Sequence, residues 1–202
     1  MIPLTIGTEK HSLPTSWGDV SVEKFFQLAN EPDLQDVFKI ISILLDIDYD
    51  TAIMIDAKYI AHTIVPMLTW LNDMPKLKEL AMPERIKIGS KWVDPHLEIR
   101  KEPQGLKILL QSSMTEDKSE QEMITYSIAV YLFFKYYKCE YSEMKKTDFE
   151  DRLSLFQKLI SQCSILEAYP VAGFFLKKSK KFRRLKPKYI NLSIPRMRFQ
   201  PV

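Results

Sequence analysis

The sequence predicts a mainly α-helical fold: a compact helical domain with a small inserted β-ribbon and an extended basic C-terminal arm. Apolar residues recur at three- and four-residue steps through most of the chain, which is the pattern of amphipathic helices. One short stretch instead alternates apolar and polar residues around a turn, as β-ribbons do. Only five of the 202 residues are glycine, which argues against most β-rich enzyme folds. We expect an N-terminal arm or edge strand over 1–16, one helical domain over 17–175 and the arm over 176–202.

The first residues predict a short strand and then a packed anchor. Residues 1–7 alternate apolar and polar side chains, and Pro3 limits such a strand to the edge of a sheet. Trp17 follows, and we expect it to pack onto the next helices rather than to bind a ligand. Ser21 suits the N-cap position of a helix over 22–30.

Acidic residues mark the following helix starts. Asp33 is expected to cap a helix whose apolar residues are Val37, Ile40, Ile41, Leu44 and Leu45. The stretch that holds Asp48, Asp50 and Asp56 could suggest a calcium loop, but it lacks the glycine and the final glutamate of that motif. We interpret these aspartates as helix caps and expect no metal site.

A third helix is predicted over 58–71. It is apolar nearly all round, so we expect it to be central, and Pro66 inside it should produce a kink or a second piece. His62 on this helix has no cysteine or carboxylate at ligand spacing, which favours a structural role.

The middle of the chain predicts a β-ribbon at about 84–101. Two alternating runs flank the turn signal Gly89-Ser90. A two-stranded hairpin alone is marginally stable in water, so the ribbon is expected to pack on the body or on another subunit. Residues 106–114 suit either a helix or a strand.

Three further helices are expected at 117–137, 148–162 and 171–180. The first is long, aromatic and buried. Thr147 or Asp148 would cap the second. The third ends in basic residues, which suits the negative pole of a helix dipole.

Charge divides the chain sharply. Residues 177–202 hold ten Lys or Arg and no Asp or Glu, so they carry about +10, whereas the first 175 residues hold 19 basic against 26 acidic residues and carry about −7. Apolar residues lie between these charges, which is unlike a solvated disordered tail. We therefore expect the arm to lie along a partner surface, most simply the acidic body of a neighbouring copy.

The residues expected to contact that neighbouring subunit are basic residues at the rim and apolar anchors in pockets. They are Lys177, Lys181, Phe182, Arg183, Arg184, Lys188, Tyr189, Ile194, Arg196, Arg198 and Phe199.

Catalytic and cofactor chemistry finds no support in the sequence. Phosphate-binding glycine loops, nucleophile elbows, zinc motifs and C-x-x-C pairs are all missing. Cys139 and Cys163 are interpreted as reduced core thiols, and the three histidines are scattered. We expect no enzyme activity, no cofactor, no signal peptide and no membrane span.

Nucleic-acid binding is the alternative from the residues alone. Ten positive charges with Phe182, Tyr189 and Phe199 between them could neutralise phosphates and stack on bases. Against it, the acidic body would repel a nucleic-acid backbone, and stacking does not use aliphatic anchors such as Ile190 or Leu192.

Several stretches resemble tail-assembly-chaperone-like proteins of tailed bacteriophages, including relatives used as neck or tail ring proteins of short-tailed (crAss-like) phages. They are IGTEKHSLPTSWGDVSVEKFFQL, RIKIGSKWVDPHLEIRKEPQGLKILL, SIAVYLFFKYY and YPVAGFFLKK. The resemblance covers about 1–180 and rests on soft patterns rather than on a catalytic fingerprint.

This resemblance implies a role in phage assembly, in one of two versions. In the version that we favour, the chain is a structural subunit of the virion and forms a homo-oligomeric ring in the neck or tail. Its partners would then be copies of itself and other neck, tail or portal proteins, with incidental contact to packaged DNA; it would be made in the cytoplasm of the bacterial host. In the alternative version, it is a chaperone that binds the tape-measure protein and leaves.

Overall fold

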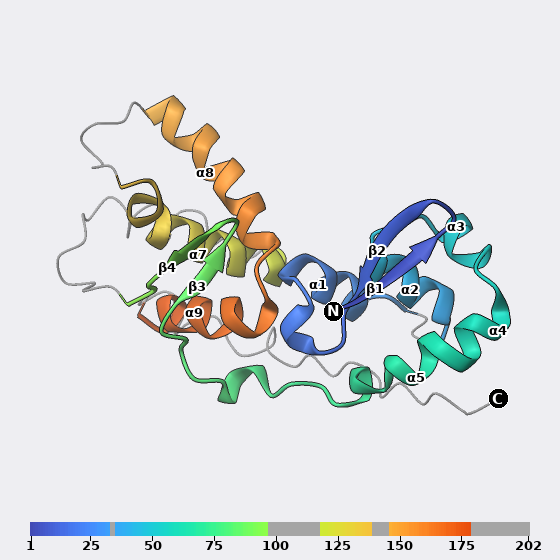
Figure 1. The fold of residues 1–202 in the computed structure, drawn as a ribbon. Helices are drawn as coiled ribbons and strands as arrows, with labels where there is room; N and C mark the ends of the chain where they lie inside the picture. Colours follow the sequence, from blue (N-terminus) through green and yellow to red (C-terminus); the bar gives the residue numbers. More distant parts are fainter. Residues whose placement is uncertain (33–34, 97–117, 139–145, 179–202) are drawn as a thin grey trace. The chain divides into compact units, whose positions relative to one another are not determined.

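The computed structural model describes residues 1–32, 35–96, 118–138 and 146–178. These residues are mainly helical, as predicted, and among them lie two small sheets of two strands each. The described residues form two compact units, residues 1–75 (unit 1) and residues 76–178 (unit 2), where we expected one helical domain over 17–175. Figure 1 shows the elements of both units.

Unit 1 opens with a β-hairpin. Strand β1 (Ile2–Ile6) pairs antiparallel with β2 (Glu9–Leu13), so that Ile6 lies opposite Glu9 across a two-residue turn. Gly7 has a φ of 61° at the first turn position, which is what a type II′ turn requires. The predicted edge strand is therefore confirmed, while β2 was not predicted.

Trp17 anchors unit 1, as predicted. It begins the short helix η1 (Trp17–Asp19), is buried, and donates its indole N–H to the Asp73 carbonyl over 2.9 Å. Its ring meets Phe25 and Trp70 edge-on, with centroids 5.7 and 5.1 Å away. The anchor thus joins the start of unit 1 to its end.

Two capped helices supply eight of the seventeen buried hydrophobic residues that the structure describes in unit 1. Helix α1 (Val22–Asn30) begins as predicted at Ser21, whose hydroxyl accepts the Lys24 N–H. Helix α2 (Val37–Leu45) is capped by Asp36, which accepts two backbone N–H groups, and not by Asp33, which lies outside the described residues.

A bent helical path follows α2. It comprises α3 (Tyr49–Ile53), α4 (Ala57–Tyr59), the π-helix η2 (Ile60–Ile64), α5 (Val65–Met67) and η3 (Thr69–Asn72). The predicted disturbance at Pro66 is confirmed in a specific form. Proline offers no N–H, and the turn before it widens, so that the Val65 N–H donates to the Ile60 carbonyl five residues back.

Unit 2 packs a ribbon and a short helix with three long helices. Its elements are η4 (Leu77–Glu79), β3 (Ile86–Ile88), β4 (Lys91–Val93), α7 (Glu120–Tyr137), α8 (Lys146–Ser161) and α9 (Ile165–Lys178). Ring contacts fill the space between the helices: Phe133 meets Phe149 and Phe156 edge-on at 5.0 and 6.0 Å, and Tyr131 stacks on Phe175 at 4.3 Å. Burying each phenylalanine contributes roughly 1.5–3 kcal/mol.

The helix ends of unit 2 differ from the predicted ones. Helix α7 starts at a capping box made by Ser119 and Glu122, three residues later than expected. Helix α8 already begins at Lys146, ahead of both predicted caps. Helix α9 starts at Ile165, so Pro170 lies inside it rather than before it.

The ribbon packs on its own chain, which is one of the two predicted outcomes. Strands β3 and β4 meet at the Gly89-Ser90 turn, where Gly89 has a φ of 57°. The Lys87 N–H donates to the Glu167 carboxylate over 3.1 Å, and the Cys163 thiol donates to the Lys87 carbonyl over 3.1 Å. The backbone N–H and carbonyl of Lys87, in the middle of β3, are thereby both hydrogen-bonded to the α8–α9 region. Residues 84–85 and 94–96 of the predicted ribbon are not strand, and 97–101 and 106–114 lie outside the described residues.

Candidate functional site

The predicted subunit-contact residues lie at and beyond the end of α9. Lys177 belongs to that helix. The other ten (Lys181, Phe182, Arg183, Arg184, Lys188, Tyr189, Ile194, Arg196, Arg198 and Phe199) lie outside the described residues. The candidate site that the structure does describe is therefore the surface of the body that such an arm could contact.

The acidic excess of the body belongs to unit 1 alone. Residues 1–75 hold four Lys or Arg and eleven Asp or Glu, a net charge of −7, whereas residues 76–176 hold fifteen of each and are neutral. The structural division at residue 75 is thus also an electrical division. Only unit 1 presents a charge opposite to that of residues 177–202.

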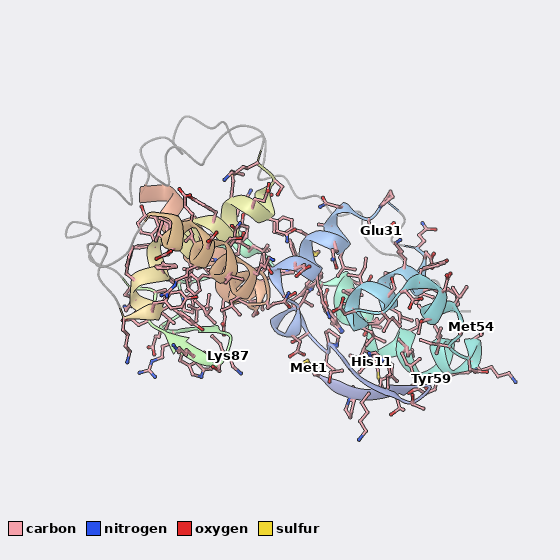
Figure 2. All side chains as sticks on the ribbon, turned by 90° about the horizontal axis from the view of Figure 1, so that it is seen from above. Met1, His11, Glu31, Met54, Tyr59 and Lys87 are labelled. Atoms are coloured by element: carbon pink, nitrogen blue, oxygen red, sulfur yellow. The ribbon has the colours of Figure 1, made fainter. Side chains whose placement is uncertain are left out.

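Exposed apolar side chains gather in the same unit. Of the seven large apolar residues that are exposed in the described part of the chain, four lie within 49–59: Tyr49, Ile53, Met54 and Tyr59. Met54 is the most exposed of the seven at 84%. Figure 2 shows Met54 and Tyr59 at one end of unit 1. We name residues 46–59 the α3–α4 corner.

Helix N-caps account for two of the four aspartates of this corner. Asp48 accepts the Thr51 N–H at 2.7 Å and the Thr51 hydroxyl at 2.6 Å, and these hydrogen bonds lower the pKa of Asp48. Asp56 caps α4 through the Tyr59 N–H. The interpretation of Asp48 and Asp56 as caps is confirmed, whereas that of Asp50 is wrong, because Asp50 lies inside the first turn of α3. All four carboxylates, including that of Asp46, belong to exposed residues.

Buried side chains attach the α3–α4 corner to the core of unit 1. Ala52 and Ile60 are buried, so α3 and η2 each keep one side on the unit while the opposite residues face solvent. The Tyr49 hydroxyl donates to Asp36 over 2.9 Å, which ties its ring to the cap of α2. The exposed apolar side chains therefore belong to helices that pack on the core of unit 1.

In unit 2, charged side chains connect the segment after β4 to helix α7. Asp94 accepts the His96 N–H at 2.8 Å and pairs with Lys135 of α7 at 3.2 Å. The hydrogen bond from the His96 backbone, with the His96 side chain and Lys135, lowers the pKa of Asp94 to about 2. The Asp94–Lys135 ion pair thus attaches the end of β4 to α7.

A partly buried carboxyl lies at the start of α7. Burial raises the pKa of Glu120 to about 7, against the opposing charge of Lys78. Burial, with the charge of Glu120, also raises the pKa of Tyr169 to about 12. Burial raises the pKa of Cys163 to about 12 too, so this thiol is a packed core group, as predicted, and a weak nucleophile. Cys139 lies outside the described residues.

The described residues include no candidate metal site and no candidate membrane-spanning helix. Within them, no three His, Cys, Asp or Glu side chains gather as metal ligands would. His11 lies on β2, His62 is exposed on η2, and His96 lies in the segment that follows β4. No helix in the part of the chain that the structure describes has the length and apolar character to cross a membrane.

Comparison of the chain with family models, with curated proteins and with solved structures finds no match. The α3–α4 corner was missed by sequence reasoning, which assigned its aspartates to caps and did not ask which apolar residues stay uncovered. A local excess of apolar residues among aspartates, in a stretch without Lys or Arg from 40 to 57, was the available signal.

Proposed function

We propose that this protein is a non-enzymatic structural subunit that assembles with copies of itself through its basic C-terminal arm. The observation that carries the proposal is the coincidence of charge and structure: unit 1 holds −7, residues 76–176 are neutral and residues 177–202 hold +10. Opposite charges steer the encounter between copies, and apolar anchors supply most of the affinity. The resemblance to tail-assembly-chaperone-like proteins extends the proposal to a ring in the neck or tail of a tailed phage.

Sedimentation velocity of the full-length chain tests the assembly step. The wild type should sediment as a species larger than the 23.7 kDa monomer at physiological salt. The variant Arg183→Glu/Arg184→Glu/Lys188→Glu should lose that species, because it reverses three arm charges. A wild type that sediments as a monomer, or an arm variant that assembles normally, would refute the proposal.

A matched control separates the position of the charges from their number. The variant Arg85→Glu/Arg152→Glu/Lys158→Glu changes the net charge equally, but at exposed residues of the neutral unit 2. It should assemble like the wild type. Mass spectrometry of purified virions tests the placement: a ring subunit is retained there, and a departing chaperone is not.

A further inference from the structure

The α3–α4 corner combines two features that seldom coincide on the surface of a monomer. It exposes Tyr49, Ile53, Met54 and Tyr59 within eleven residues, and clustered exposed apolar residues mark interaction sites. It also carries four exposed aspartates, Asp46, Asp48, Asp50 and Asp56, against one basic residue of its own, Lys58. Lys39 of α2 adds a positive charge beside it, 5.7 Å from the centre of the Tyr49 ring. A partner for this surface must therefore offer apolar side chains and positive charges together.

The C-terminal arm of the same sequence has that composition. Its apolar residues Phe182, Tyr189, Ile194 and Phe199 alternate with ten Lys or Arg over residues 177–202, where no acidic residue interrupts them. Residues 76–176 offer no comparable excess of negative charge, since their fifteen acidic and fifteen basic residues balance. Charge complementarity thus points to the corner among the described surfaces.

We propose that the α3–α4 corner is the acceptor site for residues 182–199 of a second copy of this chain. The inference rests on the proposed function and adds the receiving surface to it. The aspartates form the rim that meets arm Lys and Arg, and the four apolar residues form the floor. Met54 is suited to the floor because its flexible, polarisable side chain adapts to aromatic anchors.

The support below the corner explains why it can receive an arm without rearranging. Ala52 and Ile60 hold α3 and η2 on the core, and the Tyr49 hydroxyl is bound to Asp36 at 2.9 Å. A surface that is already ordered loses little conformational entropy on binding, so more of the contact energy appears as affinity.

A pair of full-length variants tests the corner. Asp50→Lys/Met54→Ser alters one aspartate and one floor residue, four positions apart on α3 and its C-cap, and neither residue is a helix N-cap. Asp151→Lys/Leu155→Ser on α8 makes matching changes at the same spacing, Asp to Lys and a large exposed apolar residue to Ser, and Leu155 is 59% exposed. The corner variant should weaken self-association about tenfold or more, while the α8 variant should not change it.

Mixing two defective variants tests whether the arm of one copy reaches the corner of another. The corner variant keeps its arm, and the arm variant (Arg183→Glu/Arg184→Glu/Lys188→Glu) keeps its corner. At a concentration where each alone is monomeric, their mixture should form one intact contact and sediment as a dimer of about 47 kDa, twice the chain mass. A mixture that stays monomeric, although the wild type assembles, overturns the inference. An arm that folds back on its own corner would instead leave the wild type monomeric.

The outcomes also distinguish this inference from the function on which it rests. If the arm variant is monomeric but the corner variant still assembles, the corner is not the acceptor and the proposed function stands. If the arm variant assembles as the wild type does, or if the wild type itself is monomeric, the proposed function fails and the inference fails with it.

Discussion

Glu120 and Glu122 lie two residues apart in the first turn of α7 and should respond to pH in opposite directions. Burial raises the pKa of Glu120 from its usual 4.5 to about 7. The pKa of Glu122 is lowered, because its carboxylate accepts the Ser119 N–H and hydroxyl at 2.8 and 2.9 Å. Replacing each residue with glutamine removes its charge and keeps its shape.

The sign for Glu120 follows from proton binding. Between pH 4.5 and 7 the folded protein keeps a proton on Glu120 that the unfolded chain has lost, so stability falls as the pH rises through this window. The difference between 4.5 and about 7 sets a ceiling of about 3.4 kcal/mol on this loss of stability. Water still reaches the side chain, and the N-terminus of α7 favours a negative charge there, so we expect about 1–2 kcal/mol. Glu120→Gln should therefore be more stable than the wild type by this amount at pH 8 and equal to it near pH 4.

The opposite sign is expected for Glu122. A lowered folded pKa contributes stability above 4.5, and that stability is lost as the pH falls through the folded pKa. Glutamine can still accept one hydrogen bond in the capping box, and the side chain is largely in water, so Glu122→Gln should lose only about 0.5 kcal/mol at pH 8 and nothing at low pH.

Urea unfolding at pH 4, 6 and 8 measures both variants. Far-UV circular dichroism follows both units. In a Trp92→Phe background, which removes the tryptophan of unit 2, the fluorescence of Trp17 and Trp70, which meet at 5.1 Å, follows unit 1. Only the transition of unit 2 should move. The reasoning is refuted if Glu120→Gln gains no stability at pH 8, or if its difference from the wild type is the same at all three pH values.

Three further predictions follow from packing and backbone geometry. Gly89→Ala should cost about 1 kcal/mol in urea unfolding, because Gly89 has a φ of 57°, whereas Gly173→Ala inside α9 has open space and should stabilise unit 2 by about 0.5–1 kcal/mol; equal signs would contradict this. Trp17→Phe should destabilise unit 1 by about 1–3 kcal/mol in the same assay, since the Asp73 carbonyl loses its donor; an unchanged midpoint would contradict it. Cys163 should resist iodoacetamide at pH 8 until urea unfolds the chain, as peptide mass spectrometry would show; rapid labelling of native protein would contradict its burial.

Helices were predictable where local chemistry and burial agree. Ser21 precedes an apolar face that is buried, so both signals give the same start for α1. Asp33 and Asp36 both precede the apolar pattern of α2, and local chemistry alone does not choose between them. The bond from Tyr49 to Asp36 is a tertiary contact that no local pattern contains.

The sequence-based predictions that failed are those in which tertiary packing overrides a local rule. We predicted a helix start at Val171, directly after Pro170, yet α9 begins six residues earlier, at Ile165. The reason is that Ala168, Val171 and Phe175 are buried along one continuous helix. Strand β2 has Leu13 as its only buried residue, so the sequence carried no alternating pattern to announce it. Periodicity identified the apolar residues of the α3–α4 corner but not which of them the fold would leave uncovered.

Under the proposed function, the uneven charge of this chain selects one geometry of assembly over another. Unit 1 against unit 1, or arm against arm, would join like charges of about −7 or +10, whereas arm against unit 1 joins opposite charges. A reciprocal exchange of arms between two copies gives a closed dimer, and a one-way exchange repeats from copy to copy. The one-way exchange closes into a ring where the rotation allows it and continues as a filament where it does not. Salt should therefore slow the encounter more than it hastens release, because exposed charges act over about one Debye length while the apolar anchors hold the bound arm.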